Sequence, residues 1–342
     1  MNKVSTSFSF LALLAFCLLF HHCKNTNGQE GKQSTDLRIA TTGNPAIDQL
    51  TQVITQEPDN SALYAERANL FYNNEGYDEA ISDLQKALSI DSTNIDYLHL
   101  LADCYLDYYQ SYEALNTMLE ATRLYPKRIP TLLKLSEFQF ILKQYDQSIH
   151  TINEILKLEP LQPEAYFMLG MNFKEQENID RAIGSFQTAV ENDPDIVDAW
   201  INLGQLHAEK GSKLAKYYFD NAVKVAPDNI PALHARAEFL HFSNQPQEAI
   251  ATYKKINILD PGYSESLFNT GIIYLEMDSL ASAKTHFNLA IQTSPTYIIA
   301  YYYRGLTSEL MGNKAAAKSD YQNALNLNPN FVRAKEALEK LQ

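Results

Sequence analysis

The sequence has little of the material from which metal, cofactor and catalytic sites are usually built. Its 342 residues include three cysteines, twelve glycines and eight histidines. It contains no glycine-rich phosphate loop, no His-Glu-x-x-His motif and no paired cysteines at the spacing of a zinc site. Three cysteines also cannot form the disulfide framework that staples small secreted domains. We therefore expect no enzymatic activity, no bound metal and no cofactor.

Positive charge is scarce as well. The chain has 28 Lys and Arg residues against 41 Asp and Glu residues, which gives a formal net charge of −13. DNA, RNA and anionic lipid surfaces attract basic proteins, so this balance disfavours all three as partners. A protein or peptide partner that is neutral or basic suits the charge better.

Only one long apolar run is present, from Phe8 to Phe20. Its thirteen residues are too few to span a bilayer, which takes about 20 residues in a helix. A basic residue, Lys3, precedes the run, as in the apolar region of an export signal. We expect an export signal over residues 1–22 and a flexible polar linker over residues 23–43.

Cys23 lies just after this run and begins the polar tract. The arrangement resembles the signal of bacterial lipoproteins. The resemblance implies a lipid on the Cys23 thiol and a place in the bacterial cell envelope, at the outer membrane or on the periplasmic side. His22 stands where that family usually has Gly, Ala or Ser. Two alternatives therefore stay open: ordinary cleavage between Thr26 and Gly28, which would release a soluble secreted protein, and an uncleaved anchor.

Proline recurs with a period of 33 or 34 residues. The series consists of Pro58, Pro126, Pro160, Pro194, Pro227, Pro261, Pro295 and Pro329, with Ser92 at the one missing place. A period of this length is typical of a stacked repeat array, in which each unit buries its apolar face against its neighbours. Such an array usually acts through its extended surface.

Two further columns keep the same register. Counted from Ser61, the eighth place of every unit is small and holds Ala68, Ala102, Ser136, Gly170, Gly204, Ala237, Gly271 and Gly305. Sixteen residues further on, or fifteen in the fifth unit, a large apolar residue follows: Leu84, Met118, Ile152, Phe186, Phe219, Tyr253, Phe287 and Tyr321. Another small residue lies four places before each large one, on the same helical face. Each unit is predicted to be two antiparallel helices that cross closely, with the proline ending the second helix.

Residues 197–229 show the pattern most completely. It consists there of Trp200, Leu203, Gly204, Ala215, Phe219 and Pro227. This resembles the tetratricopeptide repeat, whose pattern is W-x2-L-G-x2-Y, A-x3-F and a closing proline. The resemblance implies an all-α fold, a right-handed solenoid of antiparallel helix pairs.

The resemblance covers eight units in fixed register. They begin at residues 61, 95, 129, 163, 197, 230, 264 and 298, so the array is expected over residues 61–331. Residues 44–60 match only the second half of a unit and are predicted to form a half repeat with a single helix. Residues 332–342 are predicted to form an amphipathic capping helix with one face toward water.

The first helices of this family line a concave groove that binds peptides. Carried onto this sequence, the resemblance gives the apolar groove residues Leu133, Phe140, Phe167, Met171, Ile201, Phe268, Ile272, Tyr302 and Leu306, with the carboxylates Asp103, Glu137 and Glu238. Aromatic rings and methionines beside carboxylates suit an extended or helical peptide that has apolar anchors. Alternatively, several of these side chains pack between units, and the carboxylates are solvated helix faces.

These patterns favour two functions. The first is an exported, lipid-anchored scaffold that mediates protein–protein interactions by binding segments of a partner in its groove. The second is a noncatalytic factor that holds client proteins for an envelope or secretion complex. The identity of the partner and the oligomeric state are left open by the sequence. Cys104 is predicted to be a small buried packing residue.

Overall fold

The computed structural model describes residues 42–341, and all regular structure in that range is helical. The helices are α1 (Pro45–Gln56), α2 (Ser61–Asn73), α3 (Tyr77–Ile90), α4 (Ile95–Asp107), α5 (Ser111–Leu124), α6 (Ile129–Ile141), α7 (Tyr145–Leu158), α8 (Pro163–Glu175), α9 (Ile179–Asn192), α10 (Val197–Glu209), α11 (Ala215–Val225), α12 (Ile230–Phe242), α13 (Pro246–Leu259), α14 (Ser264–Glu276), α15 (Leu280–Thr293), α16 (Ile298–Leu310), α17 (Lys314–Leu327) and α18 (Val332–Lys340). The prediction of an all-α fold is confirmed. The expected export signal, Cys23 and nearly all of the linker lie outside the described residues.

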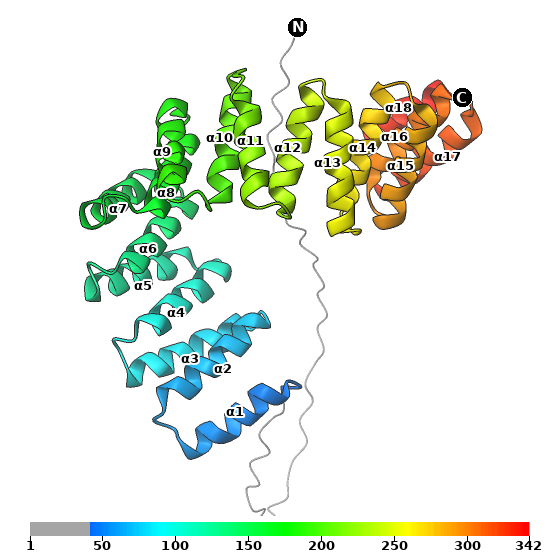
Figure 1. Ribbon diagram of the computed structural model, residues 1–342. Coiled ribbons are helices and arrows are strands. Elements are labelled where there is room, and N and C mark those ends of the chain that lie inside the picture. The colour runs from blue at the N-terminus through cyan, green and yellow to red at the C-terminus, as the bar shows by residue number, and fades with distance from the viewer. Residues whose placement is uncertain (1–41, 342) are drawn as a thin grey trace, which may run out of the picture.

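The helices from α2 to α17 form eight consecutive pairs, which we number as units one to eight. Their first helices begin at Ser61, Ile95, Ile129, Pro163, Val197, Ile230, Ser264 and Ile298, the residues at which the repeat pattern begins. The units follow one another around an open arch (Figure 1). The single helices α1 and α18 pack against α2 and α17 and cover the two ends of the array.

Polar caps and left-handed turn residues set the ends of the helices. The side chain of Asn60 accepts a hydrogen bond from the first turn of α2 at 3.2 Å, and Asn94 and Asn229 cap α4 and α12 in the same way. Within every pair, the fifteenth residue of the unit has a φ between 56° and 79°. These residues are Glu75, Tyr109, Lys143, Glu177, Gly211, Asn244, Asp278 and Gly312. The turn conformation is thus the same in all eight units although its residue varies.

The column of small residues allows the two helices of a unit to approach closely. A Cβ added to Gly170 would lie 2.5 Å from the Phe186 ring, and one added to Gly204 would lie 2.6 Å from the Phe219 ring. Both rings are buried. Such contacts leave no space for a methyl group, so glycine is required at these places by packing.

Aromatic residues at the fourth place of several units hold the loop that enters the unit. The Tyr166 hydroxyl donates to the Pro160 carbonyl at 3.0 Å, and the Trp200 indole N–H donates to the Pro194 carbonyl at 2.8 Å. The same bond recurs in the first and eighth units. The tryptophan of the repeat pattern therefore has a structural role, because its polar edge ties the loop to the helix.

Candidate functional site

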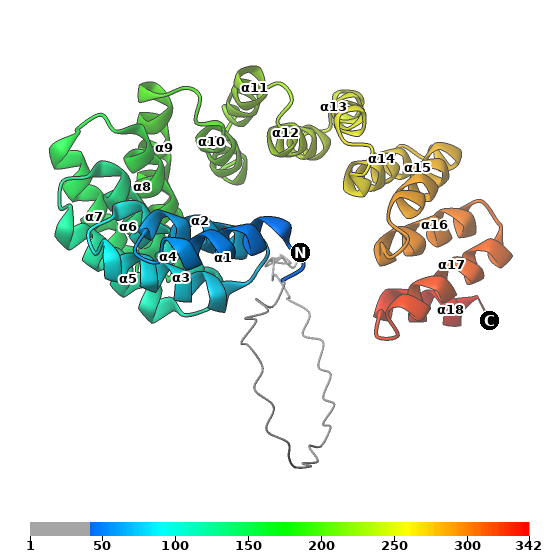
Figure 2. The same cartoon turned by 90° about the horizontal axis from the view of Figure 1, so that it is seen from below.

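The concave side of the arch is lined by first helices. Neighbouring first helices contact each other there, as α6 contacts α8 and α10 contacts α12. Figure 2 shows α10, α12 and α14 on the inner side, with α11, α13 and α15 behind them. Residues three and four places apart share a helix face, so one stripe of each first helix forms the groove surface.

Most of the predicted apolar groove residues are half-buried. These are Leu133, Phe140, Phe167, Met171, Phe268, Ile272, Tyr302 and Leu306. Ile201 differs, because it is only 8% exposed and packs in one cluster with Ala215 of α11 and Ala232 of α12. The structure thus corrects the prediction for Ile201, which lies in the contact between the fifth and sixth units and not on the groove surface.

Several of the aromatic groove residues also contact the neighbouring unit. The centroid of the Phe268 ring lies 5.3 Å from that of Tyr297 and 5.5 Å from that of Tyr303. The Tyr302 ring lies 5.6 Å from the Phe331 ring, just before α18. Phe268 thus joins the seventh unit to the eighth through Tyr303, whereas Tyr302 packs against the segment that leads into α18, and each side chain remains partly exposed.

The three predicted carboxylates differ in their surroundings. Glu137 and Glu238 are exposed. Asp103 instead forms an ion pair with Lys134 of α6 at 2.6 Å. Burial raises the pKa of the Asp103 carboxyl, although the lysine opposes this rise. The charge of Asp103 is thus balanced within the protein, and of the three predicted carboxylates only the two glutamates add net negative charge to the groove.

A pocket of about 200 Å³ opens between α10 and α12. It is lined by Gln205, Ala208, Glu209, Phe219, Ala235, Glu238, Phe239 and Phe242. Phe242 is 78% exposed, and the packed rings of Phe219 and Phe239 have centroids 5.1 Å apart. Phe239 and Phe242 were not predicted as groove residues from the sequence. Phe242 occupies the thirteenth place of its unit, one place beyond that of Phe140, so the repeat register could have found it.

Basic side chains close to this pocket are engaged by neighbours. Lys174 of α8 donates to Asn202 at 2.7 Å and to Gln205 at 3.4 Å, and burial lowers its pKa. The Nε2 atom of His241 lies 2.6 Å from a carboxylate oxygen of Glu276. Neither base forms an ion pair with the two exposed glutamates of the pocket, although Glu209 is near enough to Lys174 to oppose the fall in the pKa of that lysine. The pocket therefore combines an apolar wall with an acidic edge.

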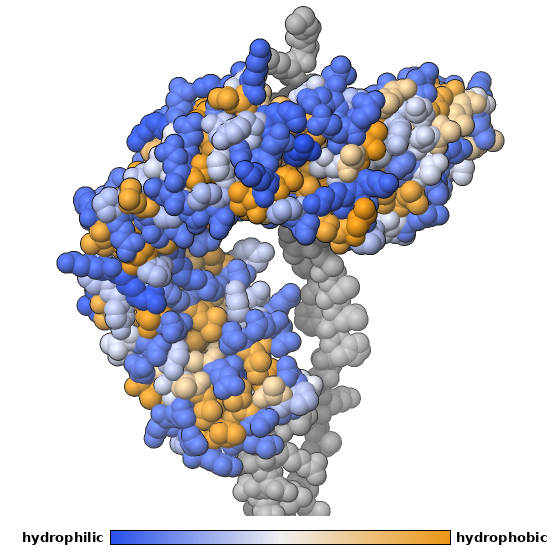
Figure 3. All heavy atoms as spheres, viewed as in Figure 1, coloured by the Kyte–Doolittle hydropathy of each residue, from blue (hydrophilic) through white to orange (hydrophobic). Residues whose placement is uncertain are grey.

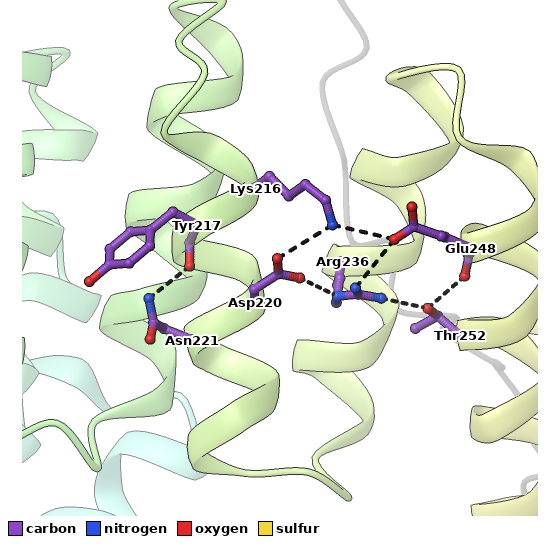
Figure 4. Close-up of polar contacts among 7 residues, drawn as sticks. All are labelled: Lys216, Tyr217, Asp220, Asn221, Arg236, Glu248 and Thr252. Atoms are coloured by element: carbon purple, nitrogen blue, oxygen red, sulfur yellow. Dashed lines mark hydrogen bonds and ion pairs between the residues drawn. The ribbon is translucent and has the colours of Figure 1, made fainter.

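The outer side of the same units carries a cluster of ion pairs between α11 and α13 (Figure 4). Arg236 of α12 donates to Asp220 at 2.6 Å and to Thr252 at 2.9 Å, and it lies 3.7 Å from Glu248. Lys216 lies 3.4 Å from Asp220 and 3.3 Å from Glu248. Two bases thus balance two acids, and the cluster ties three helices together.

The same bridge recurs in the first and eighth units. Arg67 donates to Asp83 at 2.6 Å and to Thr51 of α1 at 2.9 Å, and Arg304 makes the equivalent bonds in the eighth unit. Each arginine stands at the seventh place of its unit, where the family pattern has Leu. Each joins the second helix of its own unit to the preceding second helix, so we interpret these arginines as structural.

Four further observations concern the surface and the core. Within residues 42–341, no group of three or more His, Cys, Asp or Glu side chains is placed to hold a metal ion. No helix of that range combines the length and the apolar character that crossing a membrane requires. Cys104 is fully buried, and burial raises the pKa of its thiol to about 12. Polar side chains cover most of the face seen in Figure 3, with apolar strips between them.

These observations define a class of protein: an all-α array of helix pairs whose concave face presents apolar and acidic side chains. The tetratricopeptide repeat family matches residues 61–94, 167–216 and 298–331. The chain is a tetratricopeptide repeat protein, and its fold is that of a scaffold for protein–protein interactions.

The relatives match part of this chain and a small part of their own length. Human protein O-mannosyl-transferase TMTC1 is 27% identical over 165 residues, which are 47% of this chain and 19% of the transferase. Human tetratricopeptide repeat protein 13 is 26% identical over 181 residues, which are 51% of this chain and 20% of that protein. The chain therefore spans about a fifth of the length of these two relatives. Among solved structures, the C-terminal part of a repeat protein from Cytophaga hutchinsonii has a TM-score of 0.58 and 16% identity, and the match covers 72% of this chain and 99% of that one.

Proposed function

We propose that this protein is a scaffold that binds a segment of a partner protein in the groove between α10 and α12. The observation that carries the proposal is the pocket beside Phe239 and Phe242, with Glu209 and Glu238 at its edge. A cavity of about 200 Å³ next to an exposed ring has space for an apolar side chain of the partner. The two carboxylates favour a segment with Lys or Arg beside this apolar anchor.

The neighbouring first helices extend the proposed contact. Phe167 and Met171 of α8 lie on one side of the pocket along the array, and Phe268 and Ile272 of α14 lie on the other. All four are half-buried. An extended or helical segment that follows the groove would cover them, and desolvated aromatic anchors of this kind supply most of the binding free energy in peptide grooves. The net charge of −13 supports a neutral or basic protein as the partner, and not a nucleic acid.

Photocrosslinking in cells that express the full chain tests the groove. A photoreactive amino acid replaces Phe242 in one variant and Tyr217 in a matched control. Tyr217 is also an exposed aromatic residue, at 57%, but it belongs to the outer helix α11. We expect a discrete crosslinked product from position 242 only. The same products from both positions, or none from position 242, would contradict groove binding.

The number of products separates the two functions that the sequence favours. One stoichiometric product supports a scaffold with a dedicated partner. Many substoichiometric products support a factor that holds clients for an envelope or secretion complex. Catalysis is not part of either proposal, because repeat arrays of this family are generally noncatalytic and the match to the O-mannosyl-transferase covers 19% of that protein.

We further propose that the protein is exported and anchored in a bacterial cell envelope by a lipid on Cys23. The support is the position of Cys23 directly after the apolar run and before a polar tract. Cys23→Ser is expected to move the protein from the membrane fraction to the soluble fraction, and the mature N-terminus is expected to have the mass of an acylated cysteine. A mature chain that begins beyond Cys23 would exclude the anchor and leave groove binding untouched.

A further inference from the structure

A second aromatic surface lies in the first two units, at the turns that follow α2 and α4. It consists of Tyr72, Tyr77, Tyr108, Tyr109 and Tyr112, and we call it the tyrosine edge. The Tyr77 ring stacks on Tyr108 with centroids 5.6 Å apart and meets Tyr72 edge-on at 6.0 Å. Tyr109 is 89% exposed and Tyr112 is 76% exposed. Figure 1 shows both turns on the same side of the N-terminal arm, which comprises α1 to α7.

Carboxylates hold two of these rings in place. The Tyr72 hydroxyl donates a hydrogen bond to Asp107, and the Tyr108 hydroxyl donates to Asp78 at 3.0 Å. Each bond links adjacent units, since Tyr72 and Asp78 belong to the first unit and Tyr108 and Asp107 to the second. The two rings are thus fixed through their hydroxyl groups, and Tyr108 is still 37% exposed although one of its faces stacks on Tyr77.

Tyr109 has an aromatic side chain where the fold does not need one. Its φ of 60° is the left-handed conformation found at the fifteenth place of all eight units. The other seven residues at this place are Gly, Asn, Asp, Glu or Lys. A left-handed backbone is costly for any residue other than glycine, and here an exposed ring adds to that cost. Because seven units form the same turn without a ring, the Tyr109 ring is not needed for folding, and we look for its role in binding.

The surroundings of the tyrosine edge are strongly acidic. From residue 68 to residue 122 the sequence has ten Asp and Glu residues and a single basic residue, Lys86. The Lys86 ammonium lies 5.9 Å from the centroid of Tyr64, which is not part of the edge. Asp78 and Asp107 form no ion pair with any residue in the described range 42–341. The charges beside the rings are therefore unbalanced within the chain.

We propose that the tyrosine edge is a docking site for an arginine-bearing segment of another protein. A guanidinium group is planar and permanently charged, so it can stack on a tyrosine ring and pair with a carboxylate at the same time. Exposed rings alone would suit many partners, but the unbalanced carboxylates select a cation. The site belongs to the first two units and lies on their turn side, so it is separate from the groove between α10 and α12.

Fluorescence anisotropy with the full chain tests this docking site. The probe is a labelled peptide of alternating Arg and Ser, and matched probes carry Lys or Glu in place of Arg. We expect the Arg peptide to bind best, the Glu peptide not to bind, and the affinity to fall as salt rises. Replacing Tyr109 and Tyr112 together by Ala is expected to weaken Arg binding about tenfold, the loss of two cation–π contacts. Tyr217→Ala, an exposed position on the outer helix α11 that belongs to neither site, is expected to leave Arg binding unchanged.

A second variant separates docking from folding. Tyr109→Gly removes the ring and relieves the left-handed backbone, so we expect weaker Arg binding with an unchanged or higher melting temperature. Unchanged binding in this variant and in the double alanine variant would overturn the proposal, and weaker binding in Phe242→Ala would assign the cation to the groove instead. Replacing Lys24, Lys32 and Arg38 by Ser tests the chain's own N-terminal segment as the occupant. Tighter binding of the Arg peptide to that variant would mean that this segment occupies the site in the unaltered protein, and it would contradict the proposal that another protein docks there.

Discussion

The N-terminal and C-terminal units fill the same packing position in two different ways. In the first three units, a small residue with a Cβ faces an aliphatic side chain, as Ala68 faces Leu84. In the fourth, fifth, seventh and eighth units, glycine faces an aromatic ring, as Gly170 faces Phe186. All of these residues lie in the buried core of their unit. The helices cross closely in both types.

The difference shows that seven of the eight units keep nearly the same combined volume for this pair of residues. A larger side chain on the second helix is matched by the loss of a Cβ on the first. The sixth unit is an exception, because Ala237 faces Tyr253 there and the site holds both a Cβ and a ring. These columns belong to packing, so the residues that vary freely between units, in the groove and at the turns, are those available for binding.

The largest expected effect is the removal of a ring from the glycine type. Phe186→Ala leaves an empty space opposite Gly170, and we expect the free energy of unfolding to fall by about 3–5 kcal/mol. Leu84→Ala, in the aliphatic type, is expected to lower the free energy of unfolding by about 2–5 kcal/mol. We expect a smaller loss than for Phe186→Ala, because the Ala68 methyl group still fills part of the site. Denaturant unfolding of both variants measures the two losses. A larger loss for Leu84→Ala would break the comparison.

A smaller effect is expected from adding a methyl group to the glycine type. Gly170→Ala places a Cβ 2.5 Å from the Phe186 ring, and overpacking of this kind costs about 1–3 kcal/mol. The better helix propensity of alanine offsets up to about 1 kcal/mol of that cost. Combining Gly170→Ala with Phe186→Leu recreates the aliphatic type, so the double variant is expected to be more stable than the sum of the single losses. Simple additivity in this double-mutant cycle would contradict the volume argument.

The N-terminal arm is also expected to be sensitive to acid. Burial, with Lys134 and Arg128 nearby, lowers the pKa of His99 to about 4, and its Nε2 lies 3.1 Å from the Thr131 hydroxyl. A histidine in the unfolded chain has a pKa of about 6.5. Between pH 6.5 and pH 4 the unfolded chain therefore binds a proton that the folded chain does not, so the free energy of unfolding decreases as the pH is lowered. His99→Gln is expected to remove about 1 kcal/mol of this fall, after allowance for solvent screening of a half-buried ring.

The exposed residue His150 of the same arm supplies the control for that measurement. His150→Gln is expected to leave the pH dependence between pH 6.5 and pH 4 nearly unchanged if burial is the cause, because the His150 side chain is exposed. Melting curves over this pH range compare the two variants with the unaltered protein. Equal effects of both substitutions would show that the buried position of His99 is not the source of acid sensitivity.

Much of the fold could be predicted because its signals are local and periodic. The proline column and the small-residue column place every helix pair, and α2 and α16 begin at Ser61 and Ile298, where the first and eighth units of the pattern begin. An error of register in one unit would stand out against the other seven. The helix ends could be predicted from the same register, because the turn between the two helices has the same left-handed conformation in every unit.

The groove could be predicted only in part, because exposure depends on contacts between units. Helical register gives the side of α10 that faces inward, but Ile201 on that side is covered by α11 and α12. Phe242 stays exposed because α12 ends at that residue. Asp103 was expected from the sequence to be an unpaired carboxylate of the groove, but Lys134 of the next unit forms an ion pair with it. Neither the depth of a side chain nor its partner in another unit follows from periodicity.

The smallest expected effect concerns a glycine outside the packing columns. Gly184 is an exposed residue of α9, and a Cβ added there would have nothing within 4 Å. Glycine within a helix costs roughly 0.5–1 kcal/mol relative to alanine. Gly184→Ala is therefore expected to raise the free energy of unfolding by that amount, with the opposite sign to Gly170→Ala one helix earlier. If denaturant unfolding shows that both substitutions shift stability in the same direction, the Phe186 ring is not the reason for glycine at position 170, and the contrast between the two types of unit fails.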